Sequence, residues 1–156
     1  MRVRYWLQRC GLGLLAVLLV LTAYGYYATG EQPRRTRAVT IKAQFTASPG
    51  LQGKVHVRVF QAWAGQGVLR HALESVAAYD AQLGAHEKTI DYPINDGEGL
   101  IVYAWVDVDR DGVHCTPQRR EEPSGLAQAA SFPADVVNLQ LDLAHPCKGP
   151  EYFFPR

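Results

Sequence analysis

Three aspartates and a glycine form the chemically most distinctive stretch of this sequence. Asp107, Asp109 and Asp111 alternate along the chain, and Gly112 follows them directly. Carboxylates this close together repel one another unless a cation lies among them, and hard oxygen ligands suit Ca²⁺. A chain that curls around an ion also needs a turn with positive φ, which glycine adopts readily. The stretch therefore predicts a calcium site; the alternative is a solvated acidic turn in which each Asp bonds its own backbone.

The spacing resembles the first half of a calcium-binding EF-hand loop, D-x-[DN]-x-[DN]-G. The second half differs, because Gln118 occupies the twelfth position, where an EF-hand has a bidentate glutamate. The preceding residues 100–106 are rich in β-branched and aromatic side chains, which favours a strand over the helix of an EF-hand. We therefore predict calcium binding where a strand meets a loop, with Glu121 or Glu122 replacing the missing carboxylate.

The same region resembles an uncharacterised family of secreted bacterial β-sandwich proteins. The shared features are a Tyr-Ala pair at Tyr103, the Asp loop, and a Glu-Pro-x-Gly segment that begins at Glu122. Looser agreement in strand pattern extends over residues 39–143. The resemblance implies a compact periplasmic sandwich of transthyretin-like or immunoglobulin-like type, with no established activity.

The strands that position this loop are visible as alternating apolar and polar residues. Alternation of this kind predicts half-buried strands in residues 38–45, 54–63, 88–94 and 135–143, and the apolar run of residues 100–106 predicts a further strand. Turns rich in Gly and Pro separate these segments. The pattern predicts a mainly β fold: a single antiparallel β-sandwich over residues 38–148, behind one N-terminal transmembrane helix.

Residues 68–83 are ambiguous. Leu69, Leu73, Val76, Ala77 and Ala81 suit one face of a helix, and the alanine-rich composition supports it. A bent strand or two strands fit the length equally well. We predict a short helix here.

The N-terminus carries a membrane signal. Residues 1–9 are basic, and residues 10–28 form an uncharged apolar run long enough to cross a bilayer. We predict a retained signal anchor, a linker over residues 29–37, and a periplasmic C-terminal domain on a bacterial inner membrane. The alternative is a signal peptide whose cleavage releases the domain into the periplasm.

Two of the three cysteines, Cys115 and Cys147, lie in the predicted domain. An even pair in an exported domain most simply forms a disulfide. The neighbouring His114 and His145 leave a zinc or copper site open as an alternative, although zinc ligands are usually spaced two to four residues apart.

Charge and missing motifs limit the function. The first 37 residues carry a net charge of +5 from six arginines and one glutamate, which leaves −4 for the rest of the chain. A mildly acidic body argues against nucleic acid. Because catalytic and nucleotide-binding fingerprints are lacking, we expect no enzyme.

Two functions from different classes remain. The first is a membrane-anchored, calcium-stabilised binding module for a ligand that the sequence does not identify. The alternative is an accessory subunit of an inner-membrane complex, which contacts other membrane-protein subunits through the loop and an aromatic tail, residues 149–156.

Overall fold

The computed structural model describes residues 17–22, 24–25, 35–65, 68–69, 74–94 and 98–153. The chain divides into two compact units, Met1–Arg34 and Arg35–Arg156. In the first unit, the described residues 17–22 and 24–25 are helical, and the Thr22 hydroxyl donates to the carbonyl of Leu18 one turn earlier (2.9 Å). Among described residues, no helix has the length and apolar character needed to span a bilayer. Most of the predicted membrane segment, residues 10–28, lies outside the described part of the chain.

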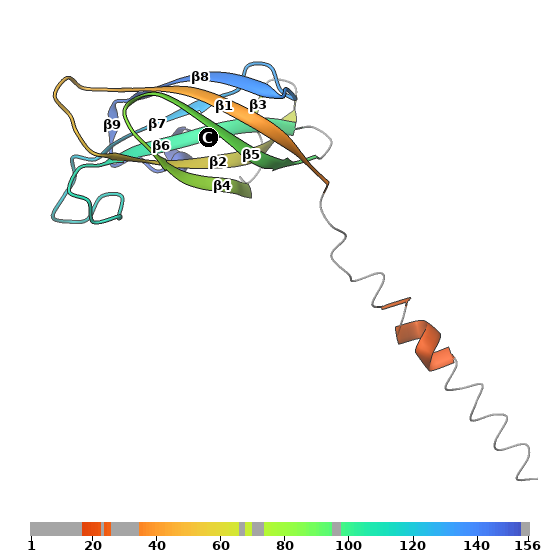
Figure 1. The fold of residues 1–156 in the computed structure, drawn as a ribbon. Coiled ribbons are helices and arrows are strands. Elements are labelled where there is room, and N and C mark those ends of the chain that lie inside the picture. Colours follow the sequence, from red (N-terminus) through yellow and green to blue (C-terminus); the bar gives the residue numbers. More distant parts are fainter. Residues whose placement is uncertain are drawn as a thin grey trace, which may run out of the picture. The chain divides into compact units, whose positions relative to one another are not determined.

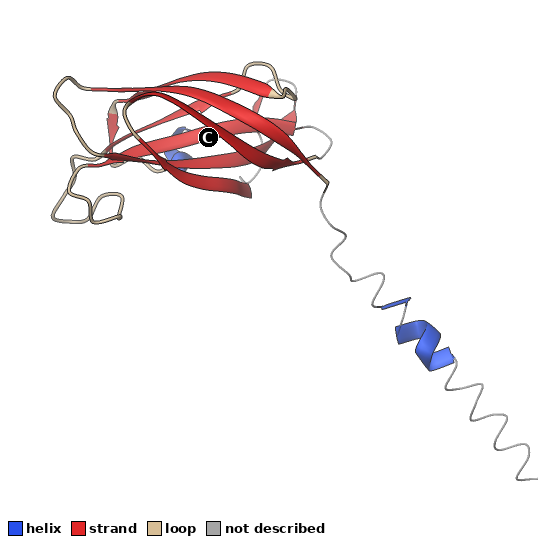
Figure 2. Cartoon of the chain, in the orientation of Figure 1, coloured by secondary structure: helices blue, strands red, loops and turns tan. Residues whose placement is uncertain are grey.

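The second unit is built almost entirely from strands (Figures 1 and 2). Its longer strands are β1 (Thr36–Ala47), β2 (Lys54–Gly65), β4 (Glu74–Ala81), β5 (Gly84–Pro93), β6 (Glu98–Asp107), β7 (Pro123–Gln128) and β8 (Val136–Leu143). Two short strands, β3 (Val68–Leu69) and β9 (His145–Pro146), and the 3₁₀ helix η1 (Pro150–Phe153) complete it.

The strands form two sheets. The small sheet has the order β5-β1-β8, and the large sheet has the order β3-β2-β6-β7-β9, with β4 also paired to β2. Apolar residues of both sheets meet in one core, so the predicted mainly β, sandwich-like fold is confirmed. The strictly antiparallel arrangement is wrong at one place, because β1 and β8 run parallel. More than 80 residues separate these strands, so the sequence pattern contains no local signal for their relative direction.

Residues 68–83 do not form the predicted helix. β4 occupies Glu74–Ala81 and pairs antiparallel with β2, with Ala81 opposite Val55 and Tyr79 opposite Val57. The ladder is irregular between Val59 and Phe60 of β2. Alanine-rich sequence favours a helix only weakly, and the available edge of β2 satisfies the backbone groups of this segment in extended form.

The core follows the predicted alternation. Successive strand residues point to opposite faces, so each strand contributes every second side chain. The inward residues of β1, β2 and β8 are buried as expected: Val39, Ile41, Ala43, Phe45, Val55, Val57, Val59, Val137, Leu139, Leu141 and Leu143. Tyr92 of β5 is fully buried, and its hydroxyl donates to the carbonyl of Gly99 (2.9 Å).

A second apolar cluster covers the outer face of the large sheet. It consists of Phe60, Ala62, Ile101, Tyr103 and Trp105. Phe153 of η1 packs against it, so part of the predicted aromatic tail lies on the domain. Residues 154–156 of that tail lie outside the described part.

The ladder registers place the loop after β6 at one end of the sandwich. Asp107 pairs with Lys54, Val55 with Ala81, and Phe45 with Gly84, so these residues share that end. Thr36, the first residue of β1, pairs with Pro93 at the opposite end. The loop after β6 therefore lies at the end of the domain away from the start of β1 (Figure 1).

Candidate metal centre

The acidic loop comprises residues 108–122, between the end of β6 and the start of β7. Asp107, the last residue of β6, is 2% exposed and projects its carboxylate into this loop. Its Oδ1 accepts a hydrogen bond from the backbone amide of Arg110 (2.6 Å), and its Oδ2 accepts one from the amide of Gly112 (3.1 Å). Arg110 and Gly112 have φ values of 65° and 76°, so the loop curls tightly around this carboxylate.

Asp109 and Asp111 continue the same pattern at the surface. The amide of Asp111 donates to Asp109 Oδ1 (3.3 Å), and the amide of Val113 donates to Asp111 Oδ1 (2.7 Å). The guanidinium of Arg119 contacts Asp109 Oδ2 at 3.3 Å. These are the local turns that the solvated alternative predicted, and they contribute to the shape of the loop.

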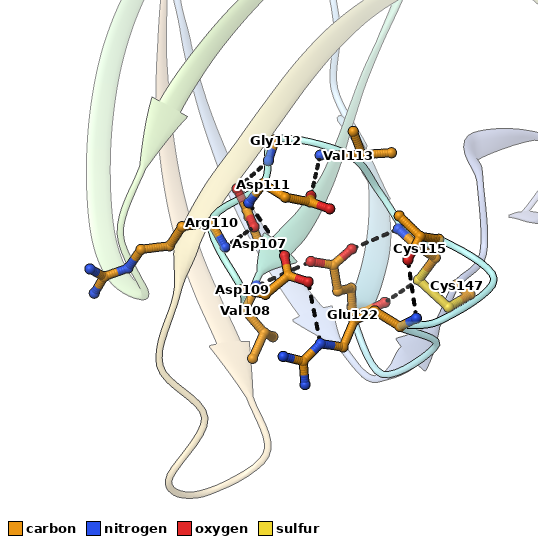
Figure 3. Close-up of polar contacts among 12 residues, drawn as sticks. Asp107, Val108, Asp109, Arg110, Asp111, Gly112, Val113, Cys115, Glu122 and Cys147 are labelled. Carbon is orange, nitrogen blue, oxygen red and sulfur yellow. Dashed lines mark hydrogen bonds and ion pairs between the residues drawn. A yellow bond between two sulfur atoms is a disulfide. The ribbon is translucent and has the colours of Figure 1, made fainter.

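Glu122 closes the loop from inside. It is fully buried, and its Oε1 and Oε2 accept hydrogen bonds from the amides of Val108 (3.2 Å) and Cys115 (2.6 Å). Its carbonyl accepts from the amide of Cys147 (2.9 Å). Glu122 thus holds the start of the loop, its middle and the C-terminal segment together (Figure 3).

Four carboxylates converge as a result. Candidate ligand oxygens of Asp107, Asp109, Asp111 and Glu122 all lie within 4.8 Å of one another. Glu121, the other predicted candidate, is exposed and is not one of these four. A carboxylate has about four lone-pair positions, so an oxygen that accepts an amide hydrogen can still bind a cation. This oxygen-only donor set is the kind that Ca²⁺ prefers.

The surroundings keep Asp107 ionised. Burial works to raise the pKa of its carboxyl group, but hydrogen bonds from His56, Gly112 and Arg110 outweigh burial, and the pKa lies below its ordinary value. The closest side-chain partner is His56 of β2, whose Nε2 lies 3.2 Å from Oδ2. An ionised carboxylate at this position favours cation binding.

The predicted disulfide is confirmed. Cys115 and Cys147 are bonded, with Cα atoms 5.5 Å apart, which excludes these thiols as zinc or copper ligands in this state. Both residues have positive φ, 58° and 54°. The bond ties the acidic loop to the segment between β9 and η1.

No protein-family model and no curated protein matches this chain. Among solved structures, it is similar to a candidate cell adhesion protein from Bacteroides eggerthii, at 13% identity and a TM-score of 0.39. That match covers 72% of this chain but only 41% of the other. It is also similar to an alternative pilotin from the type II secretion system of Vibrio cholerae, at 14% identity and a TM-score of 0.41, covering 74% of this chain and 100% of that one. Likenesses this distant carry no argument about function, and the family resemblance at the Asp loop stays a prediction.

Sequence reasoning missed a layer of aromatic rings beside the carboxylates. The imidazole of His56 stacks on Trp105, with ring centroids 4.5 Å apart, and the ring of His114 also contacts Trp105, with centroids 4.9 Å apart. His56 also binds Asp80 through Nδ1 (2.9 Å), so both its nitrogens have carboxylate partners. Period-two alternation indicated that His56 points outward, but it could not indicate which side chains from β4 and β6 would meet it.

An open groove of about 960 Å³ borders the acidic loop. Its lining includes Arg110, Asp111 and Gly112 of the loop, Lys54 and His56 of β2, and residues of the β4–β5 turn. The shape of the loop therefore sets the shape of this groove.

Proposed function

We propose that this protein is an extracytoplasmic, non-enzymatic binding module whose acidic loop is ordered by calcium. The observation that carries the proposal is Glu122, a fully buried glutamate with three further carboxylates within 4.8 Å. A buried negative charge is costly unless cations or hydrogen-bond donors compensate it. Two backbone amides compensate Glu122 in part, and a divalent ion would also offset the repulsion among the four acids.

The groove beside the loop supports a binding role. Its lining residues 110–112 belong to the same turn that Asp107 organises, so a bound ion would fix this part of the ligand site. His56, which lines the groove, contacts a carboxylate through each of its ring nitrogens. This arrangement suits a structural role better than proton transfer during an enzymatic reaction. Calcium in extracellular modules binds at about 0.1–1 mM, so we propose a structural ion and not a signalling sensor.

The proposed cellular location is supported by the disulfide and by the N-terminal sequence. A disulfide is typical of oxidising compartments outside the cytoplasm, and Cys115–Cys147 supports such a location. Retention at the outer face of an inner membrane rests on the apolar run at residues 10–28 alone. An accessory role in a membrane complex is compatible with the same arrangement.

Calorimetric titration of the full chain, in detergent and after treatment with a chelator, tests the ion site directly. We expect Ca²⁺ to bind with a dissociation constant of about 0.1–1 mM. The double variant Asp109→Ala/Asp111→Ala should abolish binding, whereas Asp91→Ala, at an exposed position of β5, should leave it unchanged. Absence of binding in the wild-type chain, or equal binding in the double variant, contradicts the proposal.

A further inference from the structure

The sheet edges of this domain differ in how they are protected. Unpaired strand edges invite association, and proteins guard them with short strands, charges, proline or a covering segment. The large sheet ends at β9, which has two residues and includes Pro146. The edge strand β5 contains Glu87, Lys88 and Asp91 and ends at Pro93. β8 lies against β7, where a side chain at Gly125 would collide with the carbonyl oxygen of Asp142.

β4 is less protected, because its only charged residues are Glu74 at its start and Asp80 near its end. It is eight residues long, contains no proline, lysine or arginine, and pairs only with β2 among the described residues. Its middle consists of Ala77 and Ala78, and Ala78 is exposed. Figure 1 shows β4 at the outer border of its sheet, beyond β2. Asp80, the second-last residue of β4, already contacts Lys54 (2.7 Å) and His56 (2.9 Å).

We propose that β4 pairs antiparallel with β4 of a second copy of this chain, across a two-fold axis at Ala78. In an antiparallel pair, two residues that lie opposite each other both point their N–H and C=O groups toward the partner strand or both point them away. Because this direction alternates along a strand, a two-fold axis must lie where a residue faces its own copy, and not between two successive residues. An axis at Ala77 would place Glu74 opposite Asp80 of the second copy, and like charges opposite each other destabilise a sheet. An axis at Tyr79 would leave only residues 77–81 to pair.

The axis at Ala78 avoids both problems. It uses residues 75–81 and places Ala77 opposite Tyr79, Val76 opposite Asp80, and Ser75 opposite Ala81. The two Ala78 methyl groups meet on the axis without crowding. The complex closes on itself, because each copy uses the least protected long edge among its described strands, and the two large sheets become continuous. The inference goes beyond the proposed function and does not depend on calcium.

Sedimentation velocity of the full chain in detergent, over a range of protein concentrations, tests this pairing. We expect a reversible dimer. Ala78→Lys places two ammonium groups opposite each other on the axis and should weaken the dimer by about tenfold or more. Ala85→Lys, at an exposed position of the guarded strand β5, is the matched control and should dimerise like the wild type.

An experiment with variants of opposite charge distinguishes edge pairing from misfolding and from association through the N-terminal segment. Ala78→Lys and Ala78→Glu should each be monomeric alone and should form a heterodimer when mixed. A wild-type chain that stays monomeric at all concentrations overturns the proposal, and then a strand from another protein is the candidate for this edge. A dimer that Ala78→Lys leaves intact, or single variants that do not associate on mixing, also overturns it.

Discussion

The backbone amide of Cys115 donates a 2.6 Å hydrogen bond to Oε2 of Glu122, so the buried carboxylate and the disulfide hold the same point of the acidic loop. The carbonyl of Glu122 receives the amide of Cys147, the other half of the disulfide. One residue therefore organises both sides of the covalent link. The loop has no regular secondary structure of its own, and these contacts replace the ladder hydrogen bonds that a strand would have.

Glu122→Gln should destabilise the protein by about 1–3 kcal/mol in the absence of metal. In the native protein, the backbone amides of Val108 and Cys115 each donate to one carboxylate oxygen of Glu122. A glutamine keeps only one acceptor oxygen, so its NH₂ group must face one of these two donors. Urea unfolding in a chelating buffer measures the loss. Glu121→Gln, at the exposed neighbouring position, should change stability by less than about 0.5 kcal/mol. Equal effects of the two substitutions would argue against a structural role for the buried carboxylate.

Stability should fall in acid partly because of Asp107. Its pKa is below the ordinary value in the folded state, so the folded protein releases this proton more readily than the unfolded chain does. The stabilisation is present above the unfolded pKa of about 3.9 and is lost as the pH falls through the lower, folded pKa. Urea unfolding of metal-free protein between about pH 5 and pH 2 should show a shallower decline for Asp107→Asn than for wild type. Asp91→Asn serves as the control and should follow the wild-type curve.

Removal of the disulfide by Cys115→Ala/Cys147→Ala should cost about 3–4 kcal/mol, because the bond closes a loop with a sequence separation of 32. The melting temperature of the wild-type protein should fall when reducing agent is added, whereas the double variant should show no such response. Hydrogen exchange should locate the change in residues 108–122 and in the segment around β9. Exchange that rises uniformly across the sandwich would contradict a local role for this link.

Tyr79→Phe should leave stability unchanged or raise it by up to about 1 kcal/mol at neutral pH. The hydroxyl oxygen of Tyr79 is buried and has no hydrogen-bond partner among the residues that the structure describes, so the substitution removes an unsatisfied polar group. Burial also raises the pKa of this phenol to about 12. The unfolded chain therefore ionises first, near pH 10, and this contribution to stability is lost as the pH rises toward 12. The variant should show a smaller alkaline loss in chemical unfolding, and a marked destabilisation at pH 7 would contradict this account.

Gly125→Ala should destabilise the sandwich by several kcal/mol, since the added Cβ would meet the carbonyl oxygen of Asp142 and lie 3.1 Å from Leu143 Cδ2. Gly50→Ala offers a contrast, because its Cβ would meet nothing within 4 Å and only the positive φ of 84° opposes it. We expect a cost of about 1–2 kcal/mol there. Similar losses at both positions in thermal unfolding would mean that β7 and β8 can separate without penalty.

The sequence by itself determined the features that depend on neighbours along the chain. The inward faces of β1, β2 and β8 follow from period-two alternation, which any extended segment must obey. The curl after Asp107 follows from short acids and a glycine that bond their own backbone, and the disulfide follows from there being only two cysteines in the domain.

Tertiary structure decided what depends on partners distant along the chain. Residues 74–81 became a strand because β2 offers them a ladder, although their local composition favoured a helix. Glu122, and not Glu121, joins the aspartates because only one of two adjacent side chains can point inward where β7 begins. His56 lies between Asp80 and Asp107 because β4 and β6 flank β2, an order that residues on β2 cannot specify. Backbone pairing and burial are non-local energies, so they select among conformations that the local sequence leaves nearly equal.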